Sequence, residues 1–397
     1  MTTQIEFYDK DVIKNTLGVL TIKPDKVVYI YDKEITDMNR FVSLEKCFKK
    51  HMPNIKVEKY PVNIFSINEI CKVLCGVMKS NENCVIDLTG GSELMTIAGY
   101  RAGMGIGVKL VYTDIIEEKV VNINDENDVI KTAQLTLEDF VDAHGAEFIG
   151  NSHAEPEENE FSRILEMCRI LFLRINKWRS TCNFFQVAMA NTAPGDLELR
   201  VNTQIRQKDG RWVSPDKDLL YEFQKLGFIK DLYFSGKYVV LTFASKKVKS
   251  YLISFGVWLE MFVYIHAVKA GVFQDVKLGT MIDWDAYDGI TVAGNEIDVI
   301  LQDRSMPVFI SCKLRAVDTP ALNELLIAKK RLGGWFSKSI IVSFGDDKAM
   351  RNGTYKRAKE LGIEVLDKTD VLSADFEERL VKAVRGHDLV GLKWKKI

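Results

Sequence analysis

Two carboxylates and a lysine in the last third of the chain have the spacing of a catalytic site. Residues 295–300 and the run that ends at Lys313 are expected to form neighbouring strands, each mostly apolar with polar groups at one end. Residues two apart on a strand share a face, so Glu296 and Asp298 lie on one side of the first strand, and Ser311 and Lys313 on one side of the second. Burying such charges is costly unless they are paired or bind a metal. The pattern predicts an oxygen-ligand site for Mg²⁺ or Mn²⁺ beside an ammonium group that can meet a phosphate or an attacking water.

A second interpretation of the same residues stays open. Glu296 and Asp298 could simply solvate the end of a strand and pair with Lys313. In either case the lysine, with an ordinary pKa of about 10.4, is cationic at neutral pH and suits an electrostatic role.

The elements that must position these residues alternate between helix and strand. Hydrophobic periodicity predicts a C-terminal α/β unit with helices at 257–269, 319–332 and 354–361 and strands at 289–301, 306–313, 339–344 and 363–366. The first 145 residues alternate in the same way, with strands at 26–31, 57–64, 84–88 and 108–112 and helices at 38–50 and 67–78. Strands spaced by helices predict a parallel, doubly wound sheet.

Between these two parts we expect a linker and a small module. Residues 150–160 are polar, acidic and contain a proline, as is typical of a linker, and a helix is expected at 161–178. Residues 219–252 then have the order helix, glycine turn at Gly227 and β-hairpin with a turn at Ser235 and Gly236, which suits a winged-helix-like module. The expected division is therefore 1–149, 150–250 and 251–397.

A glycine-containing turn joins the strand at 84–88 to the next helix. Its residues, from Thr89 to Met95, include Gly90 and Gly91, which let backbone N–H groups approach an anion at a helix N-terminus. A tight turn with Thr89 or Ser92 as the N-cap explains the same pattern without any ligand.

The C-terminal site resembles the PD-(D/E)xK nuclease superfamily. Asp298 matches the acid that ends the first strand, Lys313 matches the lysine, and Glu260 in Trp258-Leu259-Glu260 matches an acid from the preceding helix. Ser311 stands where the family has Asp or Glu, so Glu296 or Glu260 must supply the missing charge or the site is weakened. The resemblance implies a nuclease with Asp298, Lys313, Glu296, Glu260 and Ser311 in its catalytic site, and with Glu260, Glu296 and Asp298 as metal ligands.

The glycine loop resembles the ligand loop of CARF domains, the Rossmann-like sensors of cyclic oligoadenylate. Residues 135–145, 331–335 and 357–363 also resemble CARF–nuclease fusions, so the likeness runs from about residue 25 to 367, with 161–218 left unanchored. It implies a CARF domain, a winged-helix-like connector and a restriction-endonuclease-like α/β domain. The residues it places around the messenger are Thr89, Gly90, Gly91, Ser92, Glu93, Met95, Asp32, Lys33 and Lys10.

The family resemblance also implies a function. The chain would be an effector of type III CRISPR defence, a homodimer switched on by cyclic tetra-adenylate, that cuts single-stranded RNA, DNA or both. Two alternatives stay open. One is a ligand-controlled DNA-binding regulator whose nuclease site has decayed at Ser311, and the other is a ring nuclease that uses Thr89, Ser92 and Lys33 to degrade the messenger.

Composition agrees with a globular intracellular protein. The chain has 397 residues, a hydrophobic fraction of 47% and a formal net charge of −1, so it has no global attraction to nucleic acid. Its seven cysteines lack the spacing of a zinc site and are expected to be reduced thiols. The charged N-terminus and the absence of an apolar run of about 20 residues predict a cytoplasmic protein.

Overall fold

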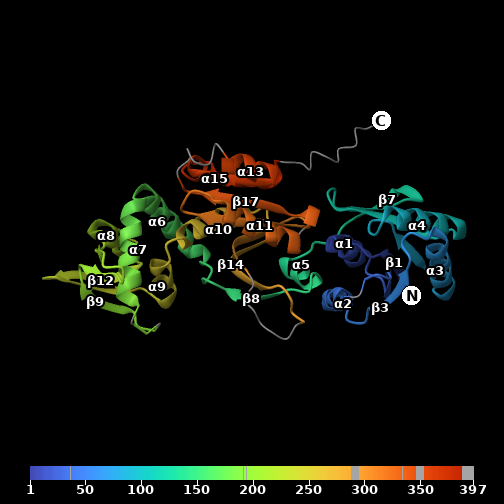
Figure 1. The fold of residues 1–397 in the computed structure, drawn as a ribbon, viewed down its shortest axis with the longest axis horizontal. Helices are drawn as coiled ribbons and strands as arrows, with labels where there is room; N and C mark the ends of the chain where they lie inside the picture. Colours follow the sequence, from blue (N-terminus) through green and yellow to red (C-terminus); the bar gives the residue numbers. More distant parts are fainter. Residues whose placement is uncertain are drawn as a thin grey trace.

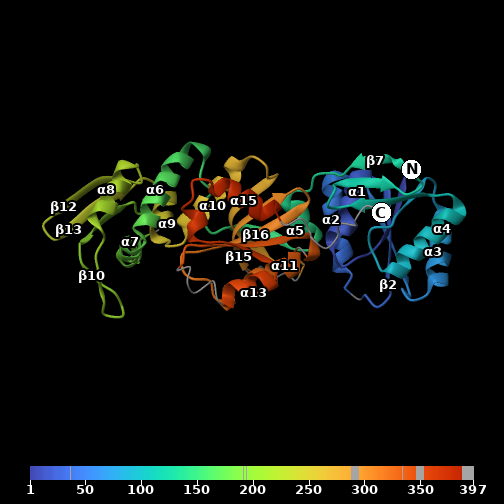
Figure 2. The same ribbon diagram turned by 90° about the horizontal axis from the view of Figure 1, so that it is seen from above.

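The computed structural model describes residues 1–35, 37–190, 192–193, 195–287, 295–332, 334–345 and 353–386. Three bodies lie in a row along its longest axis (Figure 1). The N-terminal body is at one end, the connector is at the other, and the C-terminal body lies between them, as the view from above also shows (Figure 2). The order in space therefore differs from the order along the chain.

The N-terminal body is built on a seven-stranded sheet in the order β3-β2-β1-β4-β5-β6-β7. The strands are β1 (Thr3–Phe7), β2 (Lys26–Asp32), β3 (Lys56–Val62), β4 (Cys84–Asp87), β5 (Lys109–Asp114), β6 (Lys119–Asn122) and β7 (Asp125–Lys131). Strands β1 to β5 pair in parallel, whereas β6 and β7 are added as an antiparallel hairpin. The predicted parallel sheet is confirmed, and the hairpin is an addition that the sequence analysis did not foresee.

Helices cover both faces of this sheet. They are α1 (Val12–Ile22) and α2 (Asn39–His51) on one face, and α3 (Ile67–Ser80) and α4 (Glu93–Ile106) on the other. Along β2, Val27 and Tyr29 pack towards α1 and α2, while Val28 and Ile30 pack towards α3 and α4. A strand buried on both faces is apolar throughout, which is why 26–31 could be identified from sequence.

The central strand β1 was missed for the opposite reason. Its sequence alternates apolar residues with Gln4 and Glu6, as on an exposed strand, yet all five of its residues are buried. Gln4 Nε2 donates a hydrogen bond of 2.6 Å to Glu6 Oε1 beneath α1, so two polar side chains satisfy part of each other's hydrogen bonding inside the core.

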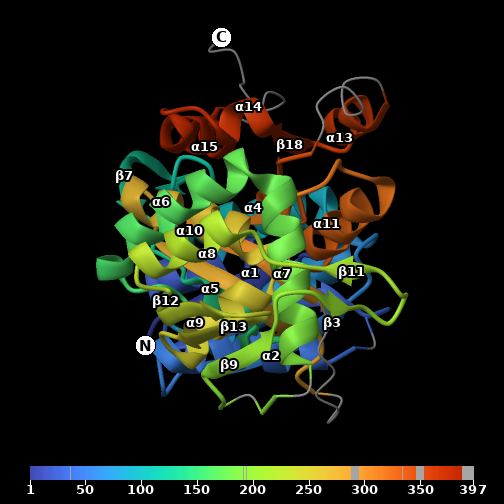
Figure 3. The ribbon, with the colours of Figure 1, turned by 90° about the vertical axis from the view of Figure 1, so that its left-hand side faces the viewer.

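The connector contains the expected winged-helix-like arrangement. Its elements are α6 (Phe161–Leu173), α7 (Ile175–Met189), β9 (Glu198–Asn202), β10 (Ile205–Arg206), β11 (Trp212–Val213), α8 (Lys217–Lys225), β12 (Ile229–Ser235), β13 (Tyr238–Phe243) and α9 (Lys246–Ile253). The three-stranded sheet has the order β12-β13-β9, and it packs with its helices at one end of the molecule (Figure 3). The single helix predicted at 161–178 is wrong, because the chain leaves helical geometry at Arg174 and α6 and α7 are separate.

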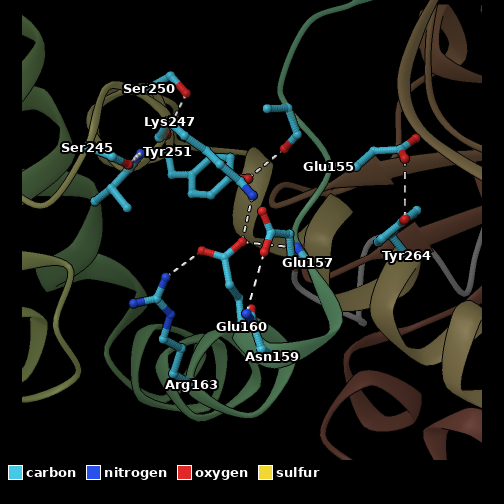
Figure 4. A network of polar contacts seen from close by, with 12 residues as sticks. Glu155, Glu157, Asn159, Glu160, Arg163, Ser245, Lys247, Ser250, Tyr251 and Tyr264 are labelled. Atoms are coloured by element: carbon cyan, nitrogen blue, oxygen red, sulfur yellow. Dashed lines mark hydrogen bonds and ion pairs between the residues drawn. The ribbon is translucent and has the colours of Figure 1, made fainter.

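The acidic segment that precedes the connector is held in place, although it was predicted to be a linker. Tyr251 donates a hydrogen bond of 2.5 Å to the Ala154 carbonyl, and Glu155 accepts one of 3.1 Å from the Leu278 N–H. Glu155 also accepts one of 3.4 Å from the Tyr264 hydroxyl (Figure 4). Glu160 forms ion pairs with Arg163 and with Lys247. These contacts fix the connector against the C-terminal body.

The C-terminal body is built on a six-stranded sheet in the order β18-β17-β16-β15-β14-β8. The strands are β8 (Glu147–Asn151), β14 (Asp275–Asp283), β15 (Asn295–Asp303), β16 (Met306–Lys313), β17 (Lys338–Ser343) and β18 (Ile363–Leu366). Strands β16 to β18 pair in parallel and the others antiparallel. Because β8 joins this sheet, the chain enters the C-terminal body just before the boundary predicted at residue 149. The division into three segments stays a prediction.

Helices also cover the faces of the second sheet. The larger ones are α10 (Val257–Ala270) and α15 (Phe376–Arg385) on one face, and α11 (Thr319–Leu332) and α13 (Tyr355–Glu360) on the other. Shorter helices are α5 (Leu137–Ala143), which packs on α2, and α14 (Lys368–Val371). The predicted helix at 319–332 and strand at 306–313 are confirmed, whereas residues 289–294 of the predicted strand at 289–301 lie outside the described residues.

Among the described residues, no single helix is long and apolar enough to cross a membrane. Only α9 and α10 taken together meet that criterion by length and composition, and they are bent by 116° relative to each other. All seven cysteines are free thiols, and Cys47, Cys168, Cys182 and Cys312 are buried.

Candidate active site

Strands β15 and β16 bring Asp298, Ser311 and Lys313 together. Val299 of β15 lies opposite Ile310 of β16, so the preceding residue, Asp298, lies beside the C-terminal end of β16. Oδ2 of Asp298 accepts hydrogen bonds from the Cys312 N–H at 2.6 Å, the Ser311 hydroxyl at 3.2 Å and Lys313 Nζ at 3.4 Å. The second oxygen of Asp298 is not used by these contacts and is left for another ligand.

Glu260 reaches the same place from the first turn of α10. The start of α10 is fixed by Trp258, which is fully buried and donates a hydrogen bond of 3.2 Å from Nε1 to the Tyr251 carbonyl. Glu260 Oε2 is buried and has no hydrogen-bond partner among the residues that the structure describes. A buried carboxylate oxygen without a partner is costly, and a cation or a proton would relieve that cost.

The pKa values reflect this crowding of carboxylates. Burial, followed by the charges of Asp298 and Glu296, raises the pKa of Glu260 well above its ordinary value. Burial also raises the pKa of Asp298, although Lys313 opposes this shift. Burial by itself would lower the pKa of Lys313, but the charge and hydrogen bond of Asp298, together with smaller contributions from Cys312 and Glu324, outweigh it and the pKa is raised. Lys313 is therefore cationic at neutral pH, while the carboxylates around it need further positive charge to be ionised together.

A cavity of about 350 Å³ opens in front of these groups. Glu296, which is exposed, and Asp298, Ser311 and Lys313 line it from the two strands. Glu324 on α11 lines it from the opposite side, and this residue was not identified from sequence. The sequence signal for it was weak, because a single glutamate on an amphipathic helix is ordinarily a solvated surface residue.

The residues present fit a divalent cation. Among the described residues, no three His, Cys, Asp or Glu side chains already surround one point as metal ligands do. However, the unpartnered oxygen of Glu260 and the free oxygen of Asp298 belong to a cluster of carboxylates in electrostatic contact. Oxygen donors of this kind suit Mg²⁺ or Mn²⁺.

The loop after β4 is held by a buried network rather than by its own residues alone. Asp87 Oδ1 accepts hydrogen bonds from the Thr89 N–H, at 2.9 Å, and from the Thr89 hydroxyl. The hydroxyl of Thr89 in turn accepts from the Thr113 N–H at 2.7 Å. Thr89 therefore fixes the loop with its side chain, and the role of Asp87 and Thr113 was missed by sequence analysis.

The two glycines of this loop are required by close packing. A Cβ at Gly90 would clash with the carbonyl oxygen of Phe7, and Gly91 has a φ of +79° with Phe7 Cβ only 2.6 Å from where its Cβ would be. Ser92 begins α4 as its N-cap, because its hydroxyl accepts a hydrogen bond of 3.4 Å from the Met95 N–H. The backbone of residues 89–93 thus lies at the N-terminus of a 14-residue helix, where negative charge is favoured.

The other residues predicted around the messenger lie in different settings. Met95 is only 2% exposed and packs in the N-terminal core. Asp32 accepts a hydrogen bond of 3.1 Å from the Glu34 N–H at the end of β2. Glu93, in the first turn of α4, is exposed at the same edge of the sheet, as is Lys33.

Lys10 instead lines a cavity between the N-terminal and C-terminal bodies. This cavity has a volume of about 1140 Å³ and is also lined by Asp11, Lys329, Lys359 and Trp335. The carboxylate of Asp11 packs against the backbone beside Trp335, since a Cβ at Gly334 would clash with Asp11 Oδ1. The loop after β1 lies beside Gly90 and also touches the segment that follows α11. Helix α11 in turn carries residues that line the cavity at Asp298 and Lys313.

Comparisons with known proteins agree with this architecture. Residues 247–382 match the family described as "Card1-like, endonuclease domain". No curated protein matches the sequence. Protein VC1899 from Vibrio cholerae is similar in structure, with 15% identity, a TM-score of 0.76, and coverage of 96% of this chain and 98% of that one.

Two further solved structures share the fold. Can2 from Sulfobacillus thermosulfidooxidans, in complex with cyclic tetra-adenylate, has 14% identity, a TM-score of 0.70, and coverage of 97% of this chain and 99% of its own. A type III CRISPR defence DNA nuclease activated by cyclic oligoadenylate has 13% identity and a TM-score of 0.54, and 96% of this chain matches 51% of that protein. Residues 247–382 are therefore similar to the Card1-like endonuclease domain, and the chain as a whole shares its fold with Can2 and with protein VC1899.

Proposed function

We propose that this protein is a metal-dependent nuclease of type III CRISPR defence that cuts phosphodiester bonds in single-stranded RNA, DNA or both when it binds a cyclic oligoadenylate. The observation that carries the proposal is the convergence of Asp298 and Lys313 on one cavity of an endonuclease domain, with Glu260 beside them. The activator we propose is cyclic tetra-adenylate, the ligand of the similar protein Can2, and the place of action is the cytoplasm.

The residues of the site have distinct roles in this mechanism. Glu260, Glu296 and Asp298 would hold Mg²⁺ or Mn²⁺, which supplies Lewis-acid polarisation of the phosphodiester and of the attacking water. Ser311 and the Cys312 N–H orient Asp298 through hydrogen bonds to Oδ2. Lys313 stays protonated and stabilises the negative charge that develops on the phosphorus oxygens during attack.

The N-terminal loop would bind the messenger through its backbone. The backbone of Gly90 to Glu93 lies at the start of α4, where a bound anion is favoured, and Lys10, Lys33 and Asp32 lie at or just beyond neighbouring strand ends. Thr89 keeps the loop in shape rather than touching the ribose, because its hydroxyl is engaged by Asp87 and Thr113. That engagement argues against Thr89 as a catalytic group of a ring nuclease.

A homodimer would complete the messenger site. Ile97, Tyr100 and Met104 are 54%, 48% and 51% exposed, and their spacing of three and four residues places them on one face of α4. An exposed apolar stripe beside the ligand loop suits an isologous contact with a second copy, whose two-fold axis would match that of a cyclic tetranucleotide. Tyr100→Glu should then give a monomer in analytical ultracentrifugation and weaken messenger binding.

The experiment that tests the function is a cleavage assay on labelled single-stranded RNA and DNA. It compares the wild-type protein with and without cyclic tetra-adenylate, and with Mn²⁺, Mg²⁺ or EDTA. Cleavage should require both the messenger and a divalent cation. Messenger loss in EDTA with no cutting of RNA or DNA under any condition would support a ring nuclease instead, and salt-sensitive binding to duplex DNA without cutting would support a regulator.

A further inference from the structure

Strand β16 lacks a carboxylate next to the catalytic lysine. Ser311, two residues before Lys313, is only 8% exposed and donates its hydroxyl hydrogen bond to Asp298 Oδ2 at 3.2 Å. It therefore orients a neighbouring carboxylate but adds no negative charge of its own. A neutral hydroxyl is a weak ligand for Mg²⁺ or Mn²⁺, so the site needs an anionic oxygen from elsewhere.

Glu324 places a carboxylate at the opposite wall of the same cavity. It lies on α11 with Ala328, one helical turn further on, and both residues line the cavity with Lys313 and Asp298. The charge of Glu324 is one of those that raise the pKa of Lys313. Glu324 has no hydrogen bond or ion pair with the residues that the structure describes, so its oxygens are available to a ligand.

The fold fixes α11 in this position. Strands β16 and β17 pair in parallel, so α11 forms the crossover between them and begins just beyond Lys313. Asp318 Oδ1 accepts a hydrogen bond of 3.1 Å from the Ala321 N–H at the start of the helix. Leu322 and Leu325 are buried against the sheet, which holds Glu324 on the cavity side of the first two turns.

We propose that Glu324 is a metal-ligating residue of the nuclease site and supplies the carboxylate that Ser311 does not. This inference rests on the proposed function, because it assigns a further residue to the same site. Ser311 is then a positioning residue, since its hydroxyl donates to Oδ2 of Asp298, and the other oxygen of Asp298 would be left to bind the cation. In this proposal the carboxylate that the family has on the strand stands instead on the following helix, and its negative charge is still in the cavity.

The test measures Mn²⁺ binding without substrate, by electron paramagnetic resonance of free Mn²⁺, together with messenger-activated cleavage. Glu324→Gln should weaken Mn²⁺ binding by about tenfold or more, because even residues behind the ligands of a metal are worth roughly 10–100-fold in affinity. Glu378→Gln is the matched control, as Glu378 is an exposed glutamate of the same domain outside the cavity. It should leave both measurements unchanged.

A double variant distinguishes a ligand from a residue with only a general structural effect. Ser311→Glu combined with Glu324→Gln returns a carboxylate to the strand, and it should regain Mn²⁺ binding and cleavage that Glu324→Gln alone has lost. Circular dichroism establishes that each variant is folded, and Glu324→Asp, which keeps the charge, should lose less than Glu324→Gln. This rescue is expected only if the two positions serve the same cation.

The outcomes separate this inference from the proposed function. If Glu324→Gln binds Mn²⁺ and cuts like the wild-type protein, while Asp298→Asn does neither, Glu324 is not a ligand and the nuclease site stands. If the double variant is folded but binds Mn²⁺ and cleaves no better than Glu324→Gln, a carboxylate at residue 311 does not replace the one at residue 324, and the two positions do not serve the same cation. If Asp298→Asn also keeps full cleavage, the proposed active site itself is wrong.

Discussion

Asp298 of β15 lies beside Lys313, the last residue of the neighbouring strand β16, with 3.4 Å between Oδ2 of the carboxylate and Nζ of the ammonium. Both side chains are largely buried, and the same carboxylate oxygen receives the Cys312 N–H at 2.6 Å. An ion pair in this setting loses much of its hydration, so it is poor evidence for stability alone. Its position at a cavity that Glu296 and Glu324 also line, within reach of the charge of Glu260, is better explained by catalysis.

Replacing either member of this pair should remove cleavage while sparing messenger binding. Lys313→Gln and Asp298→Asn keep the approximate shape of each side chain, and each should lower the single-turnover cleavage rate by about 100-fold or more, as loss of a charge-stabilising group does. Messenger binding, followed by isothermal titration calorimetry, should be unchanged because the loop after β4 is in a different body. Wild-type cleavage by Lys313→Gln would exclude Lys313 from the reaction.

The glycine loop gives a prediction with an internal control. Gly90→Ala should abolish messenger binding, since the added Cβ clashes with the Phe7 carbonyl and must displace the loop. Gly105→Ala on α4 has no atom within 4 Å of its added Cβ and should bind normally, with equal or slightly higher stability. Both are measured by titration calorimetry and thermal unfolding. Equal affinities for the two variants would place the messenger elsewhere.

The contact between Asp11 and Trp335 predicts a separation of binding from activation. The Asp11 carboxylate joins the loop after β1 to the segment that follows α11, and α11 lines the catalytic cavity. Asp11→Ala should keep messenger affinity and reduce messenger-dependent cleavage by about fivefold or more, the lower range of allosteric coupling.

Asp25→Ala is the control for that experiment. Asp25 is an exposed residue of the same domain that accepts a hydrogen bond of 2.7 Å from the Thr2 N–H. It should affect neither binding nor activation. A full response to the messenger in Asp11→Ala would show that the signal takes another route.

The buried Glu6 predicts a pH dependence of stability. Burial, followed by the charge of Asp87, raises the pKa of Glu6 well above its ordinary value, so the folded protein holds a proton that the unfolded chain releases. The free energy of unfolding should therefore fall as the pH rises from the ordinary range of a glutamate towards the raised pKa. In Glu6→Gln this contribution should vanish. Thermal unfolding from pH 4 to 8 measures the difference, and parallel curves for the two proteins would contradict it.

Much of the fold could be predicted because its strands are buried on both faces. The runs at 27–31 and 306–310 are continuously apolar, and the structure has β2 and β16 there. Strand β1 could not be predicted in this way. Its polar residues Gln4 and Glu6 alternate with apolar ones, as on a strand with one exposed face, but both side chains are buried beneath α1. Strand β8 was not predicted, and its last two residues fall in the predicted linker at 150–160, since its pairing with β14 joins residues far apart in the sequence.

The candidate site was predictable to the extent that strand periodicity fixes neighbours. Asp298, Ser311 and Lys313 lie together because β15 and β16 are adjacent and antiparallel, so the first half of β15 lies beside the end of β16. Glu324 and Asp87 were missed, since each contributes through a contact across the fold rather than through a local pattern. Met95 is the opposite case. Its position in the loop motif suggested contact with the ligand, but its side chain lies on the buried face of α4 and packs in the core.

The most direct test of the central claim measures cleavage of labelled single-stranded RNA and DNA by the wild-type protein and Lys313→Gln, with cyclic tetra-adenylate and Mn²⁺ each present or absent. We expect cutting by the wild-type protein only when both are present, and none by the variant, which should still bind the messenger. Equal cutting by the two proteins, or cutting that ignores both the messenger and the metal, would contradict this account.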